Sequence, residues 1–549
     1  MRKFLAKGGA GFKRPNLAVP VRRRGERSES IACTLCAIAF VFALGNSIFA
    51  LTRGWHNPIL DPCSFRETQT AISAYYISQG GPLLAYETPV LGAPWSIPFE
   101  FPLYQWIVSA LYKVLGMRLD AAGRVVSIFF YYLTLWPLWS LLGTFQIKKT
   151  YRLMLLTLFL TAPSYLFWPR EFLIESTALF FSIAYLACVI RYAKLPRAIT
   201  FIGATLCGLI AALVKITTFF VFPFLSGVIF ASILFTGHFK SKLSLPTKEQ
   251  WLVFLILPLL GFALLPYVAI DLWVSFSDAQ KAAVPLGKMF VSSELHCWNF
   301  GTLRQRLSGE LWKGVVFERH GNDFLGTGWM VIASLIIAVS SRKYALAALL
   351  CVLSYVALIL TFTNLFLRHT YYEYECGIFL VTLCGFSILS LLSRKGVAQY
   401  FGLALFFLTL GLQVREYYTG DFYASTRSIS GPPITALAKE IDKQSRPTDI
   451  VLIYGMGFDS ALPYYAQRRA IMDPRNLSFP LSSPIMRETF AKSLQGNAVL
   501  AVVAFCKPIS DKINVLDRLR TLQFEEKPYF SDALCDLYKP KSGQERKIS

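Results

Sequence analysis

Long apolar runs recur along the chain between Ile31 and Val414, separated by short polar connections. A helix of about 20 apolar residues crosses a hydrocarbon core of about 30 Å, and most of these runs reach that length. We therefore predict an all-α polytopic membrane protein with about eleven transmembrane helices. The predicted spans are residues 31–51, 121–145, 151–168, 172–192, 198–214, 217–237, 251–275, 327–341, 344–365, 376–393 and 398–414.

The distribution of Lys and Arg predicts the orientation of these spans. Residues 1–30 are strongly basic, and so are the connections at 148–152, 191–197, 240–248, 342–343 and 394–395. Short cytoplasmic connections carry an excess of Lys and Arg. With a cytoplasmic N-terminus, eleven spans place every basic connection inside and leave 52–120 and 276–326 as external loops. No cleavage signal follows the first span, so we expect it to be retained.

The orientation depends on the segment from Phe101 to Leu115. It is apolar but short, with Pro102 near its start and Lys113 near its end. If it crossed the membrane, every later basic connection would lie outside. We predict that it forms a juxtamembrane or re-entrant helix within the first external loop.

After residue 414 the sequence becomes polar and mixed. Strand-like stretches at 450–454 and 499–505, with a helical stretch at 434–444, predict a small α/β domain over 415–549. An odd number of spans makes this domain extracytoplasmic. Cys506 and Cys535 both lie in it, and in an oxidising compartment they could form a disulfide.

Composition excludes a soluble globular protein, because 54% of the residues are hydrophobic and only 16% are charged. The net charge of +22 could indicate nucleic-acid binding. Because much of the basic surplus lies in the N-terminal segment and the short connections, we expect no nucleic-acid partner.

Two groups of ionisable residues lie in the first external loop. Asp61, Arg66 and Glu67 belong to a stretch that reads as a short amphipathic helix. A carboxylate there could act as a general base towards an acceptor hydroxyl or amine, or the helix could simply lie at the interface with its charges solvated. Glu100 stands between Pro98 and Pro102. It could bind a metal, position an acceptor or stabilise the N-terminus of the next helix.

Three further groups lie at external ends of predicted spans, where charge is costly and therefore suggests function. Arg170 precedes Glu175 at one turn and could bind a phosphate or form a salt bridge. Lys215 is the sole charge between residues 208 and 223, and could bind a lipid phosphate or extend to the headgroups. His369, Tyr371 and Tyr372 follow Arg368, and an aromatic belt would explain only the tyrosines.

Together these groups predict a wide, charged external cavity suited to transfer from a lipid phosphate. Several of them resemble motifs of the GT-C class of polyprenyl-phosphate-dependent glycosyltransferases. The resemblance is greatest to the branch of the lipid A aminoarabinose transferases and the protein O-mannosyltransferases. Its motifs cover residues 30–400 in order: Arg66-Glu67-Thr-Gln-Thr-Ala, Glu100-Phe-Pro-Leu-Tyr, Gly116 before a helix with Arg124, Ser164 to Glu175, Gly208 to Lys215, and His369-Thr-Tyr-Tyr.

The resemblance implies roles for individual residues. An acidic residue on the first external helix serves the family as general base, often within an Asp-Glu pair where this chain has Arg66-Glu67. Glu67 is therefore the candidate base, with Asp61 in reserve. Lys215 matches a lysine near the lipid phosphate, and Arg170 and His369 are further candidates for that contact. The remaining substrate-binding candidates are Arg66, Glu100, Glu175, Tyr371 and Tyr372.

The implied function is transfer of a sugar from a polyprenyl-phosphate donor to a glycolipid, polysaccharide or protein acceptor at a bacterial inner membrane. Some members of the class use a divalent cation, but the histidines here have no ligand spacing that would assign one. One alternative is a polysaccharide polymerase or ligase that uses lipid-linked glycans. Another is a transporter of lipid or sugar without chemistry.

Overall fold

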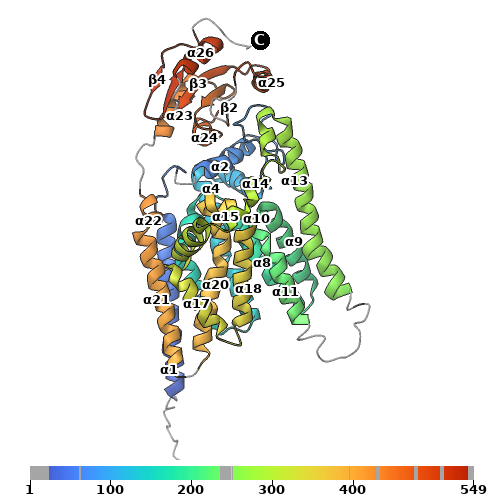
Figure 1. The fold of residues 1–549 in the computed structure, drawn as a ribbon, viewed down its shortest axis with the longest axis vertical. Helices are drawn as coiled ribbons and strands as arrows, with labels where there is room; N and C mark the ends of the chain where they lie inside the picture. The colour runs from blue at the N-terminus through green and yellow to red at the C-terminus, as the bar shows by residue number, and fades with distance from the viewer. Residues whose placement is uncertain are drawn as a thin grey trace, which may run out of the picture.

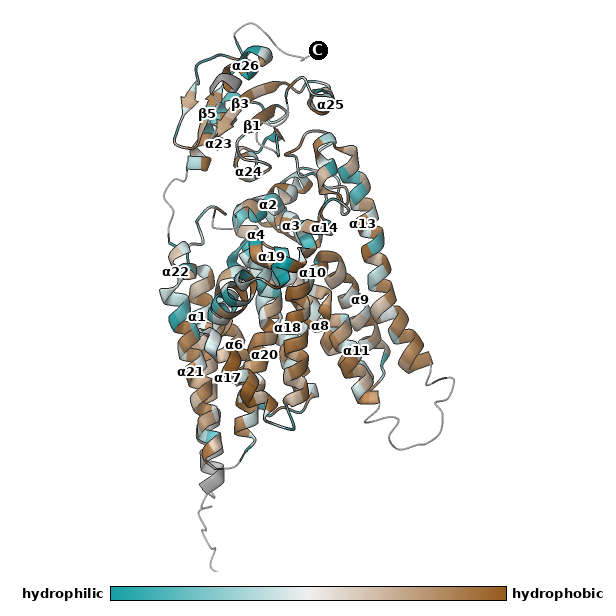
Figure 2. Ribbon diagram, viewed as in Figure 1, coloured by the Kyte–Doolittle hydropathy of each residue, from teal (hydrophilic) through white to brown (hydrophobic). Residues whose placement is uncertain are grey.

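The computed structural model describes residues 24–60, 64–234, 249, 252–394, 396–427, 433–474, 480–506 and 512–541. A bundle of apolar helices lies at one end of the molecule and a small domain with a sheet at the other (Figure 1). Figure 2 shows that hydrophobic residues dominate the bundle, whereas polar residues gather between the two parts.

The first half of the bundle contains α1 (Arg24–Thr52), α4 (Leu119–Leu133), α5 (Leu135–Thr144), α6 (Lys149–Thr161), α7 (Pro163–Phe167), η1 (Trp168–Arg170), α8 (Glu175–Lys194), α9 (Ala198–Val214), α10 (Ile216–Phe219) and α11 (Val221–Ile233). The second half contains η3 (Leu252–Ile256), η4 (Leu259–Leu264), α13 (Leu265–Ala283), η5 (Pro285–Phe290), α14 (His296–Phe300), α15 (Leu303–Arg306), η6 (Glu310–His320), α16 (Gly321–Leu325), α17 (Gly328–Val339), α18 (Ala345–Thr361), α19 (Thr363–Arg368), η7 (Thr370–Tyr372), α20 (Glu373–Leu392), α21 (Val397–Thr419) and α22 (Asp421–Ser425).

Every predicted span coincides with one or more of these helices. Among the described residues, seven helices are long and apolar enough to cross a membrane, or eight if the pair Glu310–Leu325 and Gly328–Val339, bent by 84°, counts as one. The chain is therefore a multi-pass membrane protein. The number of eleven transmembrane helices stays a prediction. The external loop predicted at 276–326 is largely helical, and His320 within it is fully buried.

The third predicted span is broken at Pro163, which cannot continue the ladder of α6. Gln413 of α21 compensates for the break. Its amide nitrogen donates to the carbonyls of Leu158 at 3.1 Å and Phe324 at 2.7 Å, and its oxygen accepts from Thr161 at 2.7 Å. One polar side chain thus satisfies backbone groups that have no water inside a membrane.

The first loop contains α2 (Ser64–Ser78) and α3 (Leu103–Leu115). At 13 residues α3 is about 20 Å long, which is too short to cross a membrane. It packs on α2 and α4 in the polar layer above the bundle. This agrees with the prediction of a helix within the loop.

The C-terminal domain contains α23 (Pro433–Gln444), β1 (Ile450–Tyr454), α24 (Ala461–Ala466), β2 (Arg469–Met472), α25 (Pro484–Ser493), β3 (Leu500–Cys506), α26 (Lys512–Leu522), β4 (Phe530–Ser531) and β5 (Cys535–Tyr538). The strand order is β2-β1-β3-β5-β4, with β1 parallel to β2 and β3 and the other pairs antiparallel. The predicted α/β domain is confirmed, and Cys506 and Cys535 form a disulfide.

This domain is attached to the first loop through the free edge of β2. Ala470 donates to the carbonyl of Pro89 at 2.8 Å, and Met472 donates to that of Val90 at 2.9 Å. The sheet is thereby extended by a segment that precedes it by about 380 residues in sequence, an edge-to-edge pairing that protects an exposed strand. Tyr464 of α24 also donates to the Asp120 carboxylate at the start of α4.

Candidate functional site

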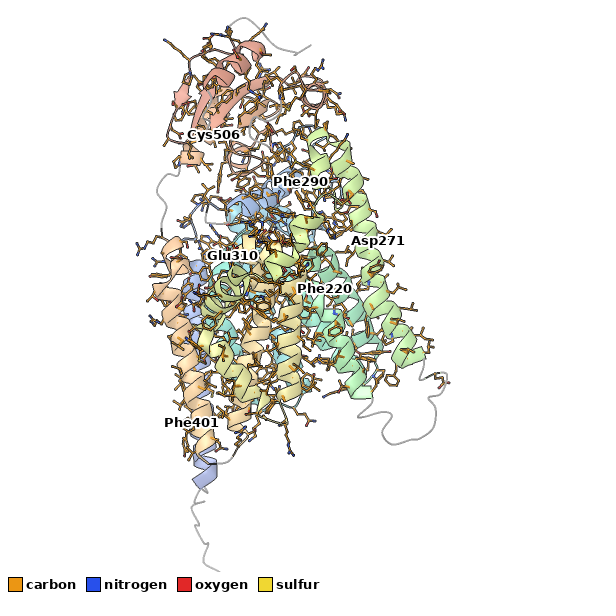
Figure 3. All side chains as sticks on the ribbon, in the orientation of Figure 1. Phe220, Asp271, Phe290, Glu310, Phe401 and Cys506 are labelled. Atoms are coloured by element: carbon orange, nitrogen blue, oxygen red, sulfur yellow. A yellow bond between two sulfur atoms is a disulfide. The ribbon has the colours of Figure 1, made fainter. Side chains whose placement is uncertain are left out.

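The polar layer between the bundle and the C-terminal domain holds the candidate site. Four elements meet there: α2, the residues around Glu100, the break between α9 and α10, and the start of α20. Figure 3 labels Phe290 in this layer; its ring lies 4.7 Å from the Phe458 ring of the C-terminal domain and 6.0 Å from that of Phe99.

Lys215 is at the centre of this layer. It lies in extended backbone between α9 and α10, and its side chain is only 4% exposed. The Nζ atom lies 2.9 Å from Oε1 of Glu175 and 3.4 Å from Oε2 of Glu375. Nζ also lies 4.2 Å from the ring centroid of Tyr372. An ammonium has three N–H donors, so two can serve the carboxylates while the third faces other groups.

Glu375 is held by more than Lys215. Its Oε2 accepts from the hydroxyls of Thr217 at 3.0 Å and Thr218 at 2.8 Å. Oε1 of Glu375 and Oε2 of Glu175 are buried and have no hydrogen-bond partner among the described residues. We call Lys215, Glu175 and Glu375 the Lys215 cluster. Its formal net charge is −1, and two of its carboxylate oxygens can still accept a hydrogen bond.

A second ion pair joins Arg66 of α2 to Glu100. Arg66 also donates to Oε1 of Gln69, which fixes the guanidinium on one face of α2. Burial alone would raise the pKa of Glu100, but the Arg66 guanidinium outweighs that effect and holds this pKa below its ordinary value. The Glu100 side chain keeps 25% of its surface exposed, so this pair is open to ligands.

His369, Tyr371 and Tyr372 stand between the two ion pairs. The ring of His369 lies 5.4 Å from that of Tyr371 and 6.0 Å from that of Tyr372. Burial, followed by the positive charges of Arg66 and Lys215, lowers the pKa of His369 to about 4. His369 is therefore neutral at physiological pH and can accept a proton or a hydrogen bond.

Comparison with known proteins identifies the architecture. No protein-family model matches the sequence, and no curated protein matches it. The structure is similar to ArnT from Cupriavidus metallidurans bound to undecaprenyl phosphate, with 13% identity, 92% of this chain and 98% of that chain covered, and a TM-score of 0.58. The chain has the GT-C glycosyltransferase fold.

Two further structures agree with this assignment. ArnT in the apo state is 16% identical, with the same coverage and a TM-score of 0.56. The archaeal oligosaccharyltransferase AglB from Archaeoglobus fulgidus, in complex with an inhibitory peptide and a dolichol-phosphate, is 11% identical, covers 86% of this chain and 69% of that chain, and has a TM-score of 0.51.

Within the GT-C fold, the candidate base Glu67 makes different contacts from Arg66. Its side chain is fully buried, and Oε2 accepts from the backbone N–H of Phe172 at 3.0 Å. The sequence suggested an interfacial helix, but residues 67–74 of α2 are all buried, because α2 lies between the bundle and α24. The reserve candidate, Asp61, lies outside the described residues.

Arg170 makes its contacts apart from the Lys215 cluster. Its Nη1 lies 3.0 Å from Oε1 of Glu171, and its guanidinium lies 5.3 Å from the ring of Phe167. Glu171 lies four residues before Glu175, the first residue of α8, and is therefore outside that helix. The structure thus brings Arg66, Glu100, Glu175, Lys215, His369, Tyr371 and Tyr372 into one layer and gives Arg170 different neighbours.

Sequence reasoning missed two contributors. Glu375 follows Tyr372 by three positions, but no spacing rule links it to Lys215, 160 positions earlier. Lys281 of α13 lies 5.2 Å from the Phe99 ring and acts electrostatically on Glu100. Its only sequence signal is a charge near the end of an apolar run. Among the described residues, no group of three or more His, Cys, Asp and Glu side chains could hold a metal ion.

Proposed function

We propose that this protein transfers a sugar from a polyprenyl-phosphate donor to an acceptor of the cell envelope. The observation that carries the proposal is the Lys215 cluster. A buried cation, two carboxylates and the Arg66–Glu100 pair meet at the boundary of an apolar bundle with the GT-C fold. The undecaprenyl phosphate bound to ArnT and the dolichol-phosphate bound to AglB support a lipid phosphate as the donor group.

In the proposed reaction, Lys215 and Arg66 bind the phosphate oxygens of the donor. A carboxylate, Glu67 or Asp61, takes the proton from the acceptor hydroxyl or amine. The acceptor oxygen or nitrogen bonds to the anomeric carbon as the bond from that carbon to the phosphate oxygen breaks. The products are the glycosylated acceptor and the polyprenyl phosphate. The two cations stabilise the negative charge that develops on the leaving phosphate.

We place this reaction on the extracytoplasmic face of a bacterial inner membrane. The end of α1 that carries the basic N-terminal segment and the turn between α20 and α21 lie at the end of the bundle opposite the C-terminal domain (Figure 1). The positive-inside rule favours a cytoplasmic location for that end. The C-terminal domain and the candidate site would then both be external. The acceptor is a glycolipid, a polysaccharide or a protein. That the reaction uses a divalent cation stays a prediction.

A polymerase or ligase that uses lipid-linked glycans is the second candidate. It would share the phosphate-binding cations and differ in the size of the transferred group. Parallel assays with a donor that carries one sugar and a donor that carries a long glycan distinguish the two candidate functions.

The proposal is tested with purified protein in lipid and a labelled polyprenyl-phosphate sugar, using isolated envelope glycolipid, polysaccharide and protein fractions as acceptors. We expect label to move to one fraction, and to stop moving when Lys215 is replaced by Met. Unchanged transfer in Lys215→Met would contradict the role of the cluster. Absence of transfer from all donors, with undecaprenyl phosphate failing to bind, would contradict the enzymatic function.

A further inference from the structure

The turn between α5 and α6, residues 144–148, lies at the end of the bundle away from the candidate site. α8 defines this position, since it begins at Glu175 in the Lys215 cluster and runs for 20 residues, about 30 Å, to Lys194. Lys194 donates to the carbonyl of Thr144, the last residue of α5. The end of α8 and the turn are therefore in contact on the far side of the bundle.

Six cations gather around this turn. Arg152 of α6 donates from Nε to the carbonyl of Ile147 at 2.7 Å. Together with Lys194 it satisfies carbonyls that the end of α5 leaves open. The remaining cations come from both flanking elements and are exposed: Lys148 and Lys149 before and at the start of α6, and Arg191 and Arg197 at and beyond the end of α8.

Acidic residues are missing from this region of the sequence. There is no Asp or Glu between residues 134 and 170 or between 176 and 248. No carboxylate within these two stretches therefore compensates the six positive charges. This differs from the candidate site, where Lys215 and Arg66 each lie against a carboxylate.

Aromatic side chains stand beside two of the cations. The Arg152 guanidinium lies 5.1 Å from the ring of Trp139, and the Nζ of Lys194 lies 5.3 Å from the ring of Phe145. Trp136, one turn before Trp139, is 62% exposed. Tryptophans beside cations are typical of the level at which lipid headgroups meet the hydrocarbon core.

We propose that this turn is a binding site for an anionic phospholipid whose headgroup carries two phosphates. The cations form two sets: Lys148, Lys149 and Arg152 at the start of α6, and Arg191, Lys194 and Arg197 at and beyond the end of α8. Each set provides charge for one phosphate, and the exposed apolar surface of α5 lies beside them for the acyl chains. This site is separate from the donor site and does not depend on the proposed function.

The test uses cardiolipin, which has two phosphates, with phosphatidylglycerol and phosphatidylethanolamine as comparison lipids. Binding of each lipid to the purified full-length protein is measured by native mass spectrometry. The site variant is Lys149→Gln with Arg191→Gln, since neither side chain has an ion pair or hydrogen bond with the described residues. The matched control, Arg342→Gln with Lys343→Gln, removes the same charge from the connection between α17 and α18.

We expect wild-type protein to bind cardiolipin more tightly than either comparison lipid. The site variant should lose affinity for cardiolipin roughly 30-fold, because two cations are removed and each contributes about 1 kcal/mol near an anionic lipid surface. The control should change less than about twofold. Equal losses in both variants, or equal binding of cardiolipin and phosphatidylglycerol, would overturn the proposal.

Discussion

Replacing Lys215 by Met separates the structural role of this residue from its proposed role in donor binding. With an effective dielectric constant of about 20, the attraction of Nζ to Glu175 at 2.9 Å is roughly 6 kcal/mol, and that to Glu375 at 3.4 Å is roughly 5 kcal/mol. Desolvation offsets much of this attraction. Removing one member of a buried ion pair typically costs about 3–5 kcal/mol, so Lys215→Met alone should destabilise the protein by that amount.

A compensated variant removes this difficulty. In Lys215→Met with Glu375→Gln, the cluster keeps its net charge of −1, because one positive and one negative charge are removed together. We expect this variant to unfold in detergent at a temperature closer to that of wild type than Lys215→Met does. Its affinity for undecaprenyl phosphate should fall roughly 10- to 100-fold, which corresponds to one charge-assisted hydrogen bond of about 1.5–3 kcal/mol.

The assay pairs thermal unfolding with titration of undecaprenyl phosphate, and uses Glu375→Gln alone as the matched control. If the compensated variant binds the lipid as tightly as wild type, Lys215 serves only to neutralise its carboxylates, and the reasoning fails. If it binds weakly and Glu375→Gln does not, the lysine itself contacts the phosphate.

Three further predictions follow from the same layer. Glu67→Gln should abolish sugar transfer at unchanged unfolding temperature and donor affinity, and full activity would exclude Glu67 as the base. Arg469→Ala breaks a bidentate pair with Glu87, with N–O distances of 2.8–3.0 Å, and should loosen the C-terminal domain by about 2 kcal/mol, seen as faster amide exchange at residues 90–92. Burial lowers the pKa of His369 to about 4, from the ordinary 6.5, so folding opposes protonation of this side chain. The free energy of unfolding should therefore be highest above pH 6.5 and should fall as the pH drops towards 4. In unfolding scans of His369→Gln, this dependence of the free energy of unfolding on pH should be weaker.

The sequence predicts those features whose physical cause is local. Each apolar run forms a helix, because inside a membrane the backbone N–H and C=O groups can form hydrogen bonds only with one another. The short segment at 101–115 contains the 13-residue helix α3, which is too short to cross a membrane, as its length predicted. Of the three parallel strands of the C-terminal domain, β1 and β3 are apolar runs and were predicted, whereas β2 was not. The disulfide between Cys506 and Cys535 was one of two alternatives that the sequence left open.

The features that sequence could not provide depend on contacts between distant segments. α2 reads as a half-polar interfacial helix, yet it is buried because α3 and α24 pack on it. The domain that contains α24 also pairs with residues 89–92 through β2. Lys215 was recognisable as a lone charge in an apolar run. Its second carboxylate, Glu375, became visible only once α10 and α20 were brought together.

The most direct test of the central claim is a density map of the protein with undecaprenyl phosphate bound. We predict that the phosphate lies in the layer beneath the C-terminal domain, with its oxygens within hydrogen-bond distance of the Nζ of Lys215 and the guanidinium of Arg66. A phosphate bound elsewhere, with Lys215 still enclosed by Glu175 and Glu375 and no lipid beside it, would contradict the account.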